Sequence, residues 1–124
     1  MKMLQMRKSI IVFLVAQILF LACFAFALHC GFRYGLTTGE SMKPAFGSVN
    51  LVFGHVPASF SELKEGDIIT FCFRNVSVCH RITGFWDEEI FTQGDNNFEG
   101  ATSWGECVRF EDVFFVVDWY VPVW

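Results

Sequence analysis

The most constraining feature of this sequence is an apolar run of nineteen residues, Ile10 to Leu28, in which Gln17 is the only strongly polar side chain. At about 1.5 Å of rise per helical residue, the run spans roughly 28 Å, close to the thickness of the hydrocarbon core of a bilayer. The sequence therefore predicts one transmembrane helix over residues 10–28.

The charges beside this run predict the orientation of the chain. Three basic residues and no acidic residue precede it, namely Lys2, Arg7 and Lys8. Basic segments next to a transmembrane helix stay on the cytoplasmic side of the membrane. We therefore expect a single-pass membrane protein with a cytoplasmic basic segment, residues 1–9, and with residues 29–124 on the exported side, extracellular or lumenal.

A cleaved leader is the alternative interpretation of the same segment. Ala25-Phe26-Ala27 has the small-x-small pattern of a leader cleavage site after a basic start. The apolar run is longer than the roughly 7–15 residues of a leader core, which favours a retained anchor. Both interpretations leave the rest of the chain outside the cytoplasm.

Length and composition exclude several classes of protein. With 124 residues, of which 53% are hydrophobic, the chain can form one compact domain and is too apolar to be disordered. Residues 31–124 contain six basic and thirteen acidic residues, a net charge of −7. A protein that binds nucleic acid through its phosphates needs a basic face, so that function is excluded.

The region after the apolar run has the pattern of an all-β domain. Short segments rich in Val, Ile, Phe and Thr alternate with Gly, Pro, Asn, Asp or Ser, which is typical of strands and turns. We predict a mostly β protein, with a small antiparallel sheet or partly closed barrel behind the transmembrane helix. The expected strands are Val49 to Phe53, Asp67 to Phe73, Val76 to Thr83, Glu89 to Thr92 and Val113 to Val121.

The five cysteines allow one geometric prediction. An odd number cannot all pair within one chain. A turn centred on Asn75 and Val76 would place Cys72 opposite Cys79, where a cross-strand disulfide fits. A zinc site is disfavoured because no second close Cys or His pair supplies the remaining ligands, and we expect neither a metal nor a cofactor.

Four short segments carry residues suited to hydrolytic chemistry. In chain order they are Gly39-Glu40-Ser41-Met42-Lys43-Pro44, Gly66-Asp67-Ile68, His80-Arg81-Ile82 and Gly94-Asp95-Asn96-Asn97. A serine, a histidine and an acid therefore occur in that order, each near the end of an expected strand. The serine also follows the membrane segment closely in the chain.

In this succession, the motifs Ser-Met-x-Pro, Gly-Asp-Ile, His-Arg-Ile and Gly-Asp-Asn-Asn resemble those of the type I signal peptidase family. The likeness is to its endoplasmic-reticulum and archaeal type, in which histidine replaces a lysine base. It covers the membrane segment and residues 39–112. The resemblance implies a membrane-anchored serine endopeptidase that removes signal peptides from exported preproteins with small side chains at the cut site.

The chemistry of a serine hydrolase assigns roles to these residues. The Ser41 hydroxyl needs a base to become an effective nucleophile, and the neutral imidazole of His80 can accept its proton. Asp95 is the expected acid that orients the imidazole. The backbone N–H of Ser41 and a group from the turn at Gly39 and Glu40 are expected to bind the oxyanion.

The third catalytic residue and the supporting residues are less sharply defined by the sequence. The family's second aspartate after the Gly-Asp-Asn-Asn turn is absent, so the acid is either Asp95 or Glu99. We expect Asp67 to bond turn amides and Arg81 to pair with Asp67 or Asp95. Met42 and Pro44 are expected to shape the site.

Two other functions compete with the peptidase hypothesis. One is a catalytically inactive, membrane-anchored β module on the same scaffold, suggested by the missing aspartate. The other is a self-cleaving peptidase of the repressor type, which shares a Gly-x-Ser-Met turn. That type uses a lysine base in the cytosol, so both His80 and the apolar helix disfavour it.

Overall fold

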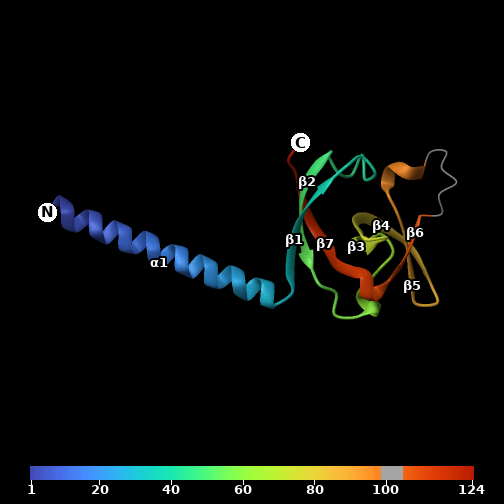
Figure 1. Ribbon diagram of the computed structural model, residues 1–124, viewed down its shortest axis with the longest axis horizontal. Coiled ribbons are helices and arrows are strands. Elements are labelled where there is room, and N and C mark those ends of the chain that lie inside the picture. The colour runs from blue at the N-terminus through green and yellow to red at the C-terminus, as the bar shows by residue number, and fades with distance from the viewer. Residues whose placement is uncertain (99–104) are drawn as a thin grey trace. The chain divides into compact units, whose positions relative to one another are not determined.

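The computed structural model describes residues 1–98 and 105–124 and divides the chain into two compact units, Met1–Phe32 and Arg33–Trp124. We call the second the β unit. The first is the helix α1 (Lys2–His29), shown in blue in Figure 1. Its length and composition are sufficient for a membrane span. It starts before the predicted residue 10 because the basic segment contains no glycine or proline to interrupt it.

Seven strands form one sheet in the order β1-β2-β7-β3-β4-β5-β6, and the pairs from β2 to β6 along this order are antiparallel. The sheet does not close, and the mostly β fold with an N-terminal apolar helix confirms the predicted fold class. The strands are β1 (Phe32–Thr38), β2 (Val49–His55), β3 (Ile68–Phe73), β4 (Val76–Trp86), β5 (Glu89–Gln93), β6 (Glu106–Arg109) and β7 (Val113–Pro122). Three short 3₁₀ helices are η1 (Phe60–Glu62), η2 (Asp95–Phe98) and η3 (Phe110–Asp112).

The five predicted strands all exist, with boundaries displaced by at most three residues, but β1 and β6 were not predicted. β1 contains Gly35, which lowers strand propensity. It also follows closely after the long apolar helix, so its short alternation of apolar and polar residues does not stand out in the sequence. β6 has only four residues. Both strands exist because their neighbours in the sheet supply hydrogen-bond partners.

The expected register, which would have placed Cys72 opposite Cys79 and allowed a disulfide between them, is wrong because the β3–β4 turn is centred one residue earlier than expected. Its central residues are Arg74 and Asn75, with φ angles of 51° and 63°, as two-residue hairpin turns of type I′ require. Moving a turn centre by one residue moves each cross-strand partner by two, so Cys72 lies opposite Ser77. Both cysteines are free thiols.

Two clusters of buried side chains hold the β unit together. The larger cluster comprises Leu63, Ile69, Phe71, Ile82, Ile90, Val108 and Val116. The smaller comprises Met42, Phe46, Val52 and Phe115. Met42 and Phe46 come from the loop between β1 and β2, so the smaller cluster anchors the loop that carries Ser41.

A histidine cluster joins three elements at the far end of β2. His55 binds Asp118 of β7 through Nδ1, with 2.8 Å between the atoms, and binds Glu62 of η1 through Nε2. The second oxygen of Glu62 accepts the N–H of Ala58. The hydrogen bond to Asp118 raises the pKa of His55 above its ordinary value of 6.5 against partial desolvation, and Glu62 adds to the rise.

This cluster predicts a pH-dependent stability. Because the folded protein binds the His55 proton more tightly than the unfolded chain does, the stabilisation is complete below about pH 6.5 and is lost as pH rises through the raised pKa. We expect the thermal midpoint of the full chain in detergent to fall with rising pH in that window. His55→Asn should lose this part of the dependence, and identical pH dependences for the two proteins would contradict the assignment.

Candidate active site

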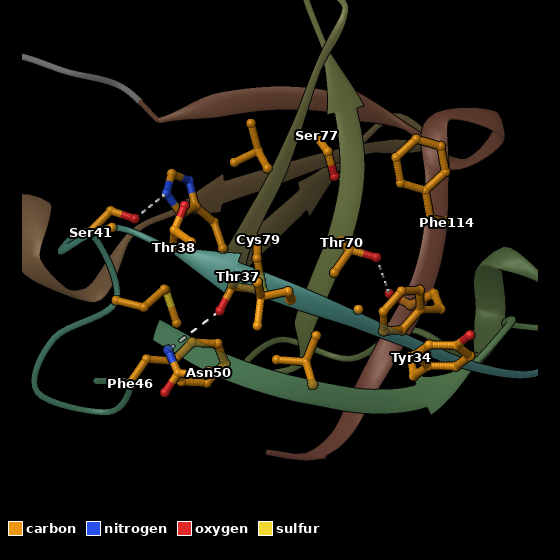
Figure 2. Close-up of a pocket in the computed structure, with 18 of the residues that line it drawn as sticks. Tyr34, Thr37, Thr38, Ser41, Phe46, Asn50, Thr70, Ser77, Cys79 and Phe114 are labelled. Carbon is orange, nitrogen blue, oxygen red and sulfur yellow. Dashed lines mark hydrogen bonds between the residues drawn. The ribbon is translucent and has the colours of Figure 1, made fainter. Parts of the chain in front are cut away.

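Three side chains from separate parts of the β unit form a hydrogen-bonded chain. Ser41 Oγ lies 3.0 Å from Nε2 of His80, the contact drawn as a dashed line at Ser41 in Figure 2. Nδ1 of the same imidazole lies 2.8 Å from Oε2 of Glu106. Ser41 is in the β1–β2 loop, His80 in the middle of β4 and Glu106 at the start of β6.

The surroundings of Glu106 set the direction of the hydrogen bonds that join Ser41, His80 and Glu106. Burial alone would raise the pKa of Glu106, but the bonds from His80 and Thr92 outweigh it, and the pKa is lowered. Glu106 is therefore a carboxylate at neutral pH and accepts the Nδ1 proton of His80. In the neutral imidazole, the other ring nitrogen then carries a lone pair toward the hydroxyl of Ser41. This is the arrangement that a general base requires.

The predicted acid Asp95 is not the partner of His80. Its two carboxylate oxygens accept hydrogen bonds from Nε and Nη2 of Arg81, at 2.9 and 2.8 Å. This fork-on-fork pair engages both oxygens of the carboxylate, and it confirms that Arg81 pairs with Asp95. The neighbouring Asn96 N–H donates to the carbonyl oxygen of Ser41 at 2.8 Å, so the ion pair anchors the segment that holds Ser41.

The other candidate acid, Glu99, lies outside the described residues. The acid that the structure supplies, Glu106, was missed because it begins a four-residue strand that was not predicted. The Thr92-to-Glu106 pairing across β5 and β6 is a long-range register, which no local pattern reveals. The only local signal was Gly105 directly before Glu106, at a position whose φ of 65° favours glycine.

Hydrogen bonds close the neck of the loop that carries Ser41. The Gly39 N–H donates to the carbonyl of Ser48 at 2.9 Å, and the Ser48 hydroxyl donates to Glu40 at 2.6 Å. The Asn50 side chain is almost fully buried and exchanges two bonds with the backbone of Gly47, at 2.8 and 2.9 Å. The Gly39 amide is therefore engaged within the loop, which leaves the N–H groups of Ser41 and Glu40 as the predicted oxyanion donors.

The remaining site-shaping residues support the same region. Asp67 accepts the Lys64 N–H at 2.9 Å, which confirms the expected bond to a turn amide. Met42 is buried in the smaller core cluster, directly after the nucleophile, and Pro44 follows within the same loop. Glu40 also forms an ion pair with Lys43. The burial of Met42 and the ion pair of Glu40 hold the loop that carries Ser41.

A cavity of about 520 Å³ opens beside Ser41 and His80. Figure 2 shows side chains from β1, β2, β3, β4 and β7 around it. Its walls mix apolar and hydroxyl side chains, including Tyr34, Thr38, Met42, Val52, Thr70 and Phe115. β1 is an edge strand of the sheet and runs along this cavity toward the nucleophile.

Other reactive groups near the cavity do not offer an alternative chemistry. Cys79 lines the cavity, but burial raises the pKa of its thiol to about 12, so it is not a thiolate at neutral pH. Within residues 1–98 and 105–124, no three His, Cys, Asp or Glu side chains gather as metal ligands would. Ser41 is the nucleophile that the arrangement favours.

Comparison with protein-family models and with curated protein sequences finds nothing that matches this chain.

Proposed function

We propose that this protein is a membrane-anchored serine endopeptidase of the signal peptidase type, which removes signal peptides from exported preproteins. The observation that carries the proposal is the continuous chain from Ser41 Oγ through both nitrogens of His80 to Glu106, beside a cavity. This chain meets the geometric requirement of an activated serine, with 3.0 Å between nucleophile and base. The motif order described above supports the choice of substrate.

The acylation step follows from these roles. Ser41 Oγ attacks the scissile carbonyl carbon while its proton passes to Nε2 of His80. The carbonyl oxygen becomes an oxyanion, for which the Ser41 N–H is the proposed donor. Glu106 stabilises the imidazolium that forms. When the oxyanion collapses, the amide bond breaks, His80 returns the proton to the leaving amine, and the signal segment remains esterified to Ser41.

The deacylation step uses the same groups with water as the nucleophile. His80 accepts a proton from the water as the oxygen attacks the ester carbonyl. The second tetrahedral species then collapses, the ester bond breaks, and the proton returns to Ser41 Oγ. The free hydroxyl is restored and the signal peptide leaves as a carboxylate, without a metal or a cofactor.

The edge strand β1 suits recognition of an extended peptide. An extended peptide can add to the edge of a sheet as a further strand by main-chain hydrogen bonds. The cavity along β1 would then accept the small side chains before the cut, with Met42 and Val52 as wall residues. Backbone pairing supplies affinity, and the cavity supplies selectivity.

The apolar helix α1 suits a substrate that is itself held in a membrane. A signal segment is lipid-embedded, so anchoring the enzyme in the same bilayer raises the effective concentration of the two. The basic residues before the helix favour a cytoplasmic N-terminus, which would put the β unit on the exported side.

A cleavage assay tests the proposal. We expect the full chain in lipid vesicles to cut a preprotein after its small-x-small site, as detected by mass spectrometry of both products. A substrate with large side chains one and three residues before the cut should resist cleavage. If no preprotein in a varied panel is cut, the inactive β module is favoured instead.

A further inference from the structure

Thr92 contacts the proposed catalytic acid Glu106, and none of the steps proposed above uses its hydroxyl. Thr92 lies on β5, its side chain is fully buried, and its hydroxyl donates to Glu106 Oε2 at 2.9 Å. The same oxygen faces Nδ1 of His80. One carboxylate oxygen therefore bridges a threonine hydroxyl and the imidazole.

The sheet register brings these groups together. Thr92 and Glu106 are direct partners across β5 and β6, and β5 separates β6 from β4, the strand of His80. Gly105 permits the close approach of the strands β5 and β6. A Cβ built on it would lie 2.0 Å from the carbonyl oxygen of Thr92. Only glycine fits there, so the backbones of β5 and β6 come close together directly beside Glu106.

We infer that Thr92 is a positioning residue for the proposed reaction, with a hydroxyl that holds Glu106 Oε2 against His80 Nδ1 and stabilises the charged form of the carboxylate. This inference rests on the proposed function. A glutamate side chain has three rotatable bonds, and a second donor on the same oxygen restricts them. Because Thr92 is not part of the cavity wall, its influence on the reaction passes through Glu106.

Thr92→Val tests the inference, since valine keeps the shape of threonine and removes the hydroxyl. Groups that orient a metal ligand from behind are typically worth about 10- to 100-fold in activity, and we take the same range for a group that orients Glu106. We expect kcat for preprotein cleavage to fall by about that factor, with KM changed less than about twofold because ground-state binding is untouched. Thr92→Ser keeps the hydroxyl and should recover most of kcat.

Thr83→Val is the matched control. Thr83 lies on β4 and donates its hydroxyl to the carbonyl of Phe91, one residue before Thr92, so its replacement also removes one hydroxyl hydrogen bond of this sheet region. It touches neither Glu106 nor His80. We expect kcat of this variant to stay close to that of the parent, and an equal loss in both variants would overturn the inference.

A second measurement does not depend on activity. In the Ser41→Ala protein, the carboxyl of Glu106 is titrated by carbon NMR with and without Thr92→Val. Loss of the donor should move the Glu106 titration to higher pH, because the hydroxyl stabilises the carboxylate. An unmoved titration overturns the inference even if kcat falls. If the parent cleaves nothing, the proposed function fails, and this titration alone decides whether Thr92 holds Glu106.

Discussion

Ser41→Ala and His80→Ala should each remove nearly all preprotein cleavage, by about 10⁴- to 10⁶-fold in kcat, as expected for the nucleophile and base of a serine hydrolase. Alanine at position 41 leaves no attacking oxygen. Alanine at position 80 leaves the hydroxyl without an acceptor for its proton and removes the group that protonates the leaving amine. The double variant should be no worse than either single variant, because the two residues act as a unit.

Controls separate lost chemistry from lost structure. Ser61→Ala removes an exposed hydroxyl that bonds only to Ser59 among the described contacts, and it should cleave like the parent. His80 is buried, so His80→Gln is included as a variant that conserves size. Circular dichroism and thermal unfolding should match the parent for Ser41→Ala. Parent-level cleavage by folded Ser41→Ala would contradict the account.

Glu106→Gln should give the second largest effect, a loss of up to about 10⁴-fold in kcat, the size seen when a triad acid is replaced by its amide. Glutamine keeps the shape of the side chain but removes the charge that stabilises the imidazolium. Its amide group can also turn an N–H toward Nδ1 and favour the wrong tautomer of His80. Steady-state kinetics on a single preprotein measures the change.

Asp95→Asn distinguishes the two acids. Asp95 is engaged by Arg81 and acts on the site through Asn96, so we expect this variant to lower thermal stability and to reduce kcat far less than Glu106→Gln does. Asparagine keeps one acceptor for Arg81 but loses the charge of the pair. A larger loss of kcat in Asp95→Asn than in Glu106→Gln would restore Asp95 as the triad acid.

The pairing of Ser41 with His80 could be predicted because each residue sits in a local motif and the motifs occur in a fixed order. The same holds for α1, whose long apolar run contains no glycine or proline and therefore predicts a helix, and for strands such as β4, whose apolar pattern is strong. The signal for each of these features lies in residues that are close together in the chain, although Ser41 and His80 themselves are 39 positions apart.

The errors share a different physical origin. The expected pairing of Cys72 with Cys79 failed because one residue of displacement in a turn moves the register of a whole hairpin. Asp95 was expected to be the acid that orients His80 because of the family motif that contains it. Its carboxylate instead binds Arg81 through two parallel hydrogen bonds. Glu106 reaches His80 only through the pairing of β5 with β6, which is a property of the folded sheet.

Trapping of the covalent intermediate tests the central claim most directly. The full chain in lipid vesicles is mixed with a preprotein, quenched in acid within the first turnover, digested, and analysed by mass spectrometry. The account predicts that the peptide containing Ser41 carries the mass of the signal segment as an ester, and that Glu106→Gln slows its formation. Cleavage that proceeds with no acylation of Ser41, or with the acyl group on another residue, would contradict the account.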